Sequence, residues 1–240
     1  MKKLRPNLSC FYVPEIELST FQLSEQESKH AIKSLRLKMG DYVLVSDGKG
    51  KLAQAQIVDD NIKNTIIQVE KIDKVPPNNN YLSIALSILQ HHDRFEWFVE
   101  KAVELGINEI TPILCLRTEK KHINTERLEK IAVSALKQSR RAYLPQINKV
   151  ETFTQFIESC KSKHRAIALC EGNRVEFNDW LQKIDKSSFT VVIGPEGDFT
   201  ENEYEQALSN NFTPVSLGDS TLRSETAAIY VAAVSRFMGR

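Results

Sequence analysis

The chain has 240 residues, of which 26% are charged and 41% hydrophobic, and its formal net charge at pH 7 is +1. This is the composition of a globular protein with one large core or two smaller ones, and any polyanionic partner must be met by a local basic patch. No apolar run approaches the roughly 20 residues that a membrane-spanning helix needs. The four cysteines show no C-x-x-C spacing and no basic-then-apolar leader is present, which favours a cytoplasmic protein with no membrane association.

The first third of the chain predicts a small, mostly β module. Residues 10–13, 41–45, 52–58 and 65–70 are short apolar stretches bounded by turn residues, as is typical of strands. A capping pattern at Ser24 predicts a short helix toward residue 34. The segment 74–80, with two prolines and three asparagines, fits neither helix nor strand and divides the chain into domains 1–74 and 75–240.

After this boundary, strands and helices alternate. Apolar alternation predicts a strand over 82–88, and a helix follows from Asp93 until Gly106 ends it. Further strands are predicted at 109–115, 166–170, 189–193 and 213–217, and further helices at 125–141, 201–210 and 224–238. This rhythm favours an α/β domain with a mainly parallel sheet covered by helices on both faces.

Glycines follow three of the predicted strands, at Gly172, at Gly194 with Gly197, and at Gly218. A single glycine of this kind is usually turn geometry, but ligands of parallel sheets bind at the carboxyl ends of the strands. The stretch VVIGPEGDFTENE, residues 191–203, joins a strand to a helix-capping box at Thr200 through such a loop. Because no phosphate-binding glycine motif is present, the loops favour a flat heterocycle over a triphosphate.

Between Arg117 and Lys149 the chain holds nine Lys or Arg and three Glu, a local excess of six positive charges. Along the predicted helix 125–141, Lys130, Lys137 and Arg141 share one side. This side is either a solvated helix face or a surface that follows RNA phosphates. The adjacent His91 and His92 point to opposite faces of an extended chain, which argues against a metal site, and the sequence predicts no metal.

The last predicted helix begins near Arg223 and Glu225. A glutamate is favourable at a helix start, whereas an arginine there is opposed by the helix dipole. Arg223 therefore indicates an anionic partner or a catalytic role.

Two motifs are specific as a pair: IGPEGDFT at 193–200 with a later Glu203, and Leu217-Gly218 followed by LRSETA at 222–227. With shorter matches around His30, Arg36, Lys101, Arg140 and Pro145, the chain resembles the RsmE family of ribosomal RNA methyltransferases over nearly its whole length. Asp198 departs from the family, which often has a glycine there, and Asp adopts a left-handed backbone only moderately well.

The resemblance implies a SPOUT-type α/β domain with a carboxyl-terminal trefoil knot, an amino-terminal PUA-like β-barrel that binds RNA, and a homodimer. It implies S-adenosylmethionine (SAM) as cofactor and 16S ribosomal RNA of the small subunit as substrate, with methyl transfer to N3 of a uridine. The cofactor residues that it implies are Leu169, Gly172, Ile193, Gly194, Pro195, Glu196, Gly197, Leu217, Gly218 and Leu222.

Candidate catalytic residues are Arg223, Glu225 and Arg140. Arg223 or Arg140 would stabilise the uracil anion, and the sequence leaves open whether Glu225 or Glu196 takes the proton. Candidate RNA-binding residues are Arg5, Arg36, Lys38, Lys130, Lys137 and Arg141. The alternative function is a non-catalytic RNA-binding protein, which would not need three glycine strand ends.

Overall fold

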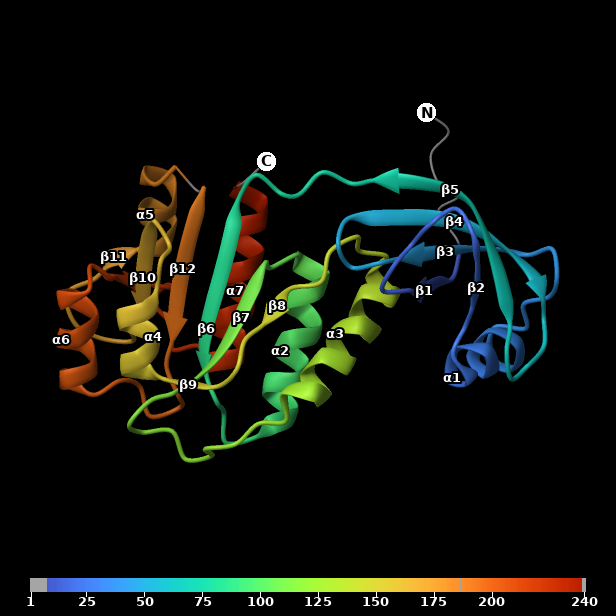
Figure 1. Ribbon diagram of the computed structural model, residues 1–240. Helices are drawn as coiled ribbons and strands as arrows, with labels where there is room; N and C mark the ends of the chain where they lie inside the picture. Colours follow the sequence, from blue (N-terminus) through green and yellow to red (C-terminus); the bar gives the residue numbers. More distant parts are fainter. Residues whose placement is uncertain (1–7, 186, 239–240) are drawn as a thin grey trace. The chain divides into compact units, whose positions relative to one another are not determined.

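The computed structural model describes residues 8–185 and 187–238, and in it the chain divides into two compact units (Figure 1). The first unit contains the chain up to Pro77 together with Val133–Leu144. The second contains Asn78–Ala132 and the chain from Pro145 onward. The second half of one helix therefore belongs to the first unit, although more than fifty residues of the second unit precede it.

The first unit is built around a five-stranded sheet in the order β1-β3-β4-β5-β2. All neighbouring strands are antiparallel except β1 and β3. The five strands are β1 (Cys10–Tyr12), β2 (Thr20–Gln22), β3 (Tyr42–Ser46), β4 (Lys51–Asp59) and β5 (Ile66–Lys74), and helix α1 (Glu25–Lys29) continues directly as a π-helix over His30–Ser34.

Along β4, buried and more exposed side chains alternate: Ala53, Ala55 and Ile57 are buried, while the residues between them are not. The buried face of β4 therefore forms part of the core of this unit. Its three buried residues belong to one core cluster with Phe11 of β1 and Val43 of β3. The mostly β module predicted for this part of the chain is thus confirmed.

The second unit contains an eight-stranded sheet with the order β11-β13-β10-β12-β6-β7-β8, and β9 also pairs with β7. Every pairing in it is parallel, in agreement with the predicted strand-helix rhythm. Its strands are β6 (Tyr81–Ser87), β7 (Glu109–Leu114), β8 (Gln146–Ile147), β9 (Glu151–Thr152), β10 (His164–Ala168), β11 (Val175–Glu176), β12 (Ser188–Ile193) and β13 (Thr213–Ser216).

Helices cover both faces of this sheet. On one face, α4 and α6 pack against Ala85, Ile167 and Val192. The other face is covered by α7, which contacts β6 and β12 and also packs against α2 and α5. The helices of the unit are α2 (His92–Leu105), α3 (Thr125–Ser139, whose last residues belong to the first unit), α4 (Phe153–Ser159), α5 (Phe177–Lys183), α6 (Glu201–Ser209) and α7 (Ser224–Met238).

Two helices, α4 and α5, are absent from the sequence-based prediction. Each has seven residues, too few for a clear helical period. A local signal existed for α4, because Thr152 and Gln155 form a reciprocal capping box at its start.

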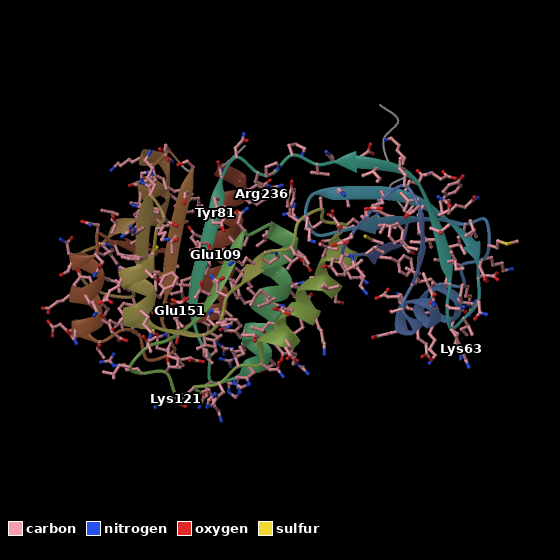
Figure 2. The ribbon with its side chains drawn as sticks, viewed as in Figure 1. Lys63, Tyr81, Glu109, Lys121, Glu151 and Arg236 are labelled. Atoms are coloured by element: carbon pink, nitrogen blue, oxygen red, sulfur yellow. The ribbon has the colours of Figure 1, made fainter. Side chains whose placement is uncertain are left out.

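The strands of the sheet are all parallel, so their carboxyl ends lie along the same edge of the sheet. Figure 2 shows Tyr81 and Glu109 near the amino ends of β6 and β7, where the Tyr81 hydroxyl donates to Glu109 Oε2 at 3.1 Å. Lys121 lies beyond the opposite, carboxyl edge. Among the described residues, no helix combines the length and apolar character needed to cross a membrane.

Candidate active site

Three neighbouring strands, β13, β10 and β12, end at the same edge of the sheet, and the loops that follow them enclose a pocket of about 250 Å³. We call it the strand-end pocket. Its lining includes all the predicted cofactor residues except Gly172 and Gly197, and in full it consists of Ala168–Cys170, Arg174, Ile193–Glu196, Asp198, Leu217–Ser224 and Ala227.

Gly194 begins the loop after β12 and is buried. A Cβ at this position would lie 3.0 Å from the ring of Phe199, which itself packs against Phe153 in the core. Any larger residue would therefore push Phe199 or the loop away. At Gly197 a Cβ would face Arg117 at 3.5 Å, an ordinary contact, so the loop depends less strictly on glycine there.

Asp198 adopts a left-handed backbone with φ of 60°. Its Oδ1 accepts a hydrogen bond from Phe199 N at 2.8 Å, which is a local compensation that short acidic side chains can make. The chain then enters α6 through Thr200, whose hydroxyl accepts from Glu203 N, while Glu203 Oε2 accepts from Thr200 N. The predicted capping box is confirmed.

Two residues from other loops fix the conformation of this loop, and sequence reasoning missed both. Arg117 Nη1, after β7, donates to the carbonyl oxygens of Gly197 at 2.8 Å and Phe199 at 3.2 Å. Gln90 N, after β6, donates to Glu196 Oε1 at 3.1 Å. These contacts join segments about 80 and 106 residues apart in the sequence. Contacts at such a distance leave no local motif from which Arg117 or Gln90 could have been identified.

The loop after β13 needs glycine because of its positive φ, and not because a side chain would clash. Gly218 has φ of 122°, and a Cβ there would contact nothing within 4 Å. The Ser216 hydroxyl bonds to both Gly218 N and Gly218 O, so the turn is fixed locally. Gly172 also has a positive φ, 94°, but lies outside the pocket lining.

Arg223 and Glu225, adjacent in the motif, have different environments. Arg223 is exposed, lines the pocket, and its carbonyl accepts from Ala227 N in the first turn of α7. Glu225 is 5% exposed and lies outside the lining. Its Oε1 is 3.9 Å from Arg94 Nε on α2, and its buried Oε2 has no hydrogen-bond donor among the described residues.

Cys170 also lines the pocket, and burial raises the pKa of its thiol, with the Asp198 carboxylate acting in the same direction. Burial raises the pKa of Cys115, a core residue directly after β7, to about 12. Both thiols are therefore protonated at neutral pH and are not nucleophiles of the thiolate kind.

The remaining predicted site residues lie elsewhere. Arg5 is outside the described residues. Arg36 and Lys38 are exposed after the π-helix, Lys130 is exposed on α3, and Lys137 pairs with Glu27. Arg141 is half-buried just beyond the end of α3, and its carbonyl accepts from the Ser46 hydroxyl. Arg140, predicted as a second catalytic cation, lines a different cavity in the first unit.

The charges of the strand-end pocket favour a cationic ligand. Three carboxylates line it, from Glu196, Asp198 and Asp219, against two guanidinium groups, from Arg174 and Arg223. Within the described ranges no group of acidic, histidine and cysteine side chains could hold a metal ion. The rest of the lining consists of apolar side chains, glycine backbone, and the side chains of Cys170, Ser220, Thr221 and Ser224.

Residues 76–236 match the RNA methyltransferase domain family, and residues 23–70 match the RNA methyltransferase PUA domain family. The fold is that of an RNA methyltransferase domain that follows a PUA-like sheet. Over 228 residues the chain is 31% identical to Ribosomal RNA small subunit methyltransferase E of Rickettsia conorii, an alignment that covers 93% of this chain and 92% of the relative. The chain belongs to the family of ribosomal RNA small subunit methyltransferase E.

Solved structures agree with this assignment. A structure from Porphyromonas gingivalis, described as a probable rRNA-methyltransferase, is 34% identical with a TM-score of 0.85 and covers 94% of this chain and 95% of its own. A methyltransferase structure from Legionella pneumophila, in complex with the bound cofactor SAM, is 25% identical with a TM-score of 0.86 and covers 97% and 98%. The family resemblance is confirmed, and so are the mostly parallel α/β sheet and the separate PUA-like sheet of the predicted fold class.

Proposed function

We propose that this protein transfers a methyl group from SAM to N3 of a uridine in the 16S ribosomal RNA of the small subunit. One observation carries the proposal: a pocket formed by three glycine-bearing strand ends, with an exposed arginine on its wall, in a chain of this family. The Legionella relative supports the choice of cofactor, since it binds SAM with a fold that matches this chain over nearly its full length.

The pocket fits SAM in shape and charge. Leu169, Ile193, Leu217 and Leu222 offer apolar walls for the adenine and the ribose, and the backbone at Gly218 is open to a ligand. The excess of carboxylates suits the positive charge of a sulfonium. When bound, SAM supplies the electrophilic methyl group. The predicted residues Gly172 and Gly197 do not line the pocket. They would act indirectly, by shaping the loops that carry the lining residues.

The residues at the rim would prepare the uridine. N3 of uridine carries a proton at neutral pH, and its loss leaves a negative charge shared with the two ring carbonyls. Arg223, exposed on the wall of the pocket, would stabilise that charge with its planar guanidinium. Glu196 lines the pocket and is our candidate for the proton acceptor. Glu225, buried against Arg94, would position the start of α7 and hence Arg223.

The proposal extends to the whole chain. Residues 1–74 would form the PUA-like RNA-binding barrel and residues 75–240 the SPOUT methyltransferase domain. The chain leaves β12 through α6 and returns as β13 beyond β10, a path compatible with the trefoil knot of the family. We also propose a cytoplasmic homodimer, in which a second copy would cover exposed apolar side chains such as Trp97 on α2, 46% exposed.

Two measurements test this function. Calorimetric titration of the full chain with S-adenosylhomocysteine (SAH) should show one site per chain. Mass mapping of 16S ribosomal RNA from cells that lack the protein should show the loss of one methyluridine, which the purified protein restores with SAM. Failure to bind SAH would favour the alternative of a non-catalytic RNA-binding protein. A complete set of methyluridines in the deletion strain would contradict the assigned substrate.

A further inference from the structure

A second cavity, of about 590 Å³, lies wholly within the first unit and has no part in the site described above. Two segments form it: residues 8–35, which contain β1, α1 and the π-helix, and residues 134–140 at the end of α3. We call it the basic cavity. Its lining consists of Leu8, Ser9, Cys10, Gln26, Glu27, Lys29, His30, Lys33, Ser34, Leu35, Ser134, Lys137, Gln138 and Arg140.

The charge of the basic cavity is strongly positive. Four cationic side chains line it against the single carboxylate of Glu27. Lys137 pairs with Glu27, and Lys29 pairs with the exposed Glu25, whereas Lys33 has no ion-pair partner in the part of the chain that the structure describes. Burial raises the pKa of the Cys10 thiol to about 12, so this thiol adds no negative charge at neutral pH. Such a lining attracts an anion.

The backbone at Arg140 points to a functional side chain. Arg140 has φ of 52° and ends α3 in a Schellman turn, in which Arg141 N bonds to Leu136 O and Arg140 N to Lys137 O. Glycine is the usual residue at this position, because a side chain makes the left-handed conformation unfavourable. Arg140 thus keeps an unfavourable backbone on the wall of a cationic cavity, and backbone outliers of this kind cluster at ligand-binding sites.

The neutral part of the lining narrows the class of ligand. Ser9, Ser34, Ser134 and Gln138 offer hydrogen-bond donors. The one aromatic ring of the lining is the small imidazole of His30, and the lining contains no Phe, Tyr or Trp on which a base could stack. Proteins that hold single-stranded bases use such aromatic rings, whereas phosphate contacts come from Lys, Arg, Ser and Gln. The cavity therefore suits a sugar-phosphate backbone better than a base.

We propose that the basic cavity binds backbone phosphates of the RNA substrate, with Arg140, Lys33 and Lys137 as the principal ligands. This inference rests on the proposed function, which supplies the RNA. Contacts of this kind position an RNA without reading its sequence. Arg140 then acts on the RNA backbone and not on the uracil ring, so its loss changes RNA affinity and leaves the chemical step intact.

The test compares two cavity variants, Arg140→Gly and Lys33→Gln, with two matched controls. Asn211→Gly is the control for the backbone: like Arg140, Asn211 has a left-handed backbone, with φ of 63°, but it lies in the second unit. Lys63→Gln removes one exposed lysine of the first unit outside the cavity (Figure 2). Arg140→Gly relieves an unfavourable backbone, so its melting temperature should not fall, and a loss of binding cannot be assigned to unfolding.

Filter binding with a 16S ribosomal RNA transcript at several KCl concentrations should show about 10-fold weaker binding for each cavity variant. The slope of log K against log salt should fall by about 0.7 for each lost phosphate contact. Both controls should match the wild type, SAH affinity should be equal in all five proteins, and single-turnover methylation at saturating RNA should be normal for Arg140→Gly.

Three results would overturn the inference while the proposed function stands. The first is wild-type RNA affinity and salt slope in both cavity variants. The second is a reduced methylation rate for Arg140→Gly at saturating RNA, which would make Arg140 catalytic. The third is competition of the RNA by free uridine monophosphate at micromolar concentration, which would indicate a site for a free nucleotide. By contrast, if the wild type binds the RNA through the cavity but neither binds SAH nor methylates, only the proposed function fails.

Discussion

The strand-end pocket of the second unit and the basic cavity of the first are constructed from different parts of the chain. Loops after three parallel strands form the pocket, with glycine backbone and leucine side chains as its main surfaces and a slight excess of carboxylates. The basic cavity is formed by β1, α1, the π-helix and the end of α3, and four cationic side chains line it against one carboxylate. Backbone conformation should therefore control ligand binding in the pocket, whereas side-chain charge should control it in the cavity.

Arg223 is an exception to that contrast, because it is a charged side chain in a pocket where backbone conformation should control ligand binding. We expect Arg223→Ala to lower the single-turnover methylation rate by about 10²–10³-fold, the range for the loss of one fixed electrostatic donor. SAH affinity should change far less, and Arg223→Lys should recover part of the rate. Arg236→Ala, at the other end of α7, is the control. A normal rate at saturating RNA would make Arg223 a binding residue and would break the assignment.

Gly218 tests whether backbone conformation controls the pocket. Gly218→Ala adds a methyl group in open space but at φ of 122°, which costs about 1–2 kcal/mol and displaces the turn, so SAH affinity should fall by about 10-fold. Gly40→Ala is the matched control, since Gly40 also has a positive φ, 95°, and open space around it, but lies in the first unit. Both variants should lose similar stability in thermal unfolding. Equal SAH affinities in the two would contradict the role of the Gly218 turn.

Arg117 tests whether the loop after β12 must be held in place from outside. Arg117→Ala removes two hydrogen bonds to the carbonyls of Gly197 and Phe199, each contributing about 0.5–1.5 kcal/mol. We expect SAM to bind about 3- to 10-fold more weakly, with a higher KM for SAM and little change in kcat. A lower kcat with an unchanged KM would instead mean that Arg117 acts on the RNA or on the chemistry.

Cys170 offers the mildest probe, because it reports on the pocket without altering it. Its pKa is raised, so the thiolate fraction is small at neutral pH, and maleimide labelling should become faster as the pH rises from 7 to 9. Saturating SAH should slow this labelling, and Cys170→Ser identifies the labelled residue. The pKa of about 12 for Cys10 and Cys115 keeps both protonated over this range. Labelling that SAH leaves unchanged would place the ligand away from β10.

The loop after β12 shows how much of the site was accessible to sequence reasoning. The strand over 189–193, the turn at Gly194 and the capping box at Thr200 were all predicted, because turn geometry and helix capping depend on neighbours in the sequence. The same reasoning did not find Arg117 or Gln90, which hold this loop from two other strand ends. It also left the backbone at Asp198 open, and the structure resolves it as left-handed.

The sequence alone determined the alternation of strands and helices, the three strand ends that carry glycine and the family to which the motifs belong, since each depends on local propensity or on a contiguous motif. Only the tertiary structure decided that 133–144 joins the first unit, that Glu225 is buried against Arg94, and that Arg140 shares a cavity with Lys33. These features arise when segments some fifty to more than a hundred residues apart pack together. Burial and cavities are properties of that packing, and no local pattern of residues encodes them.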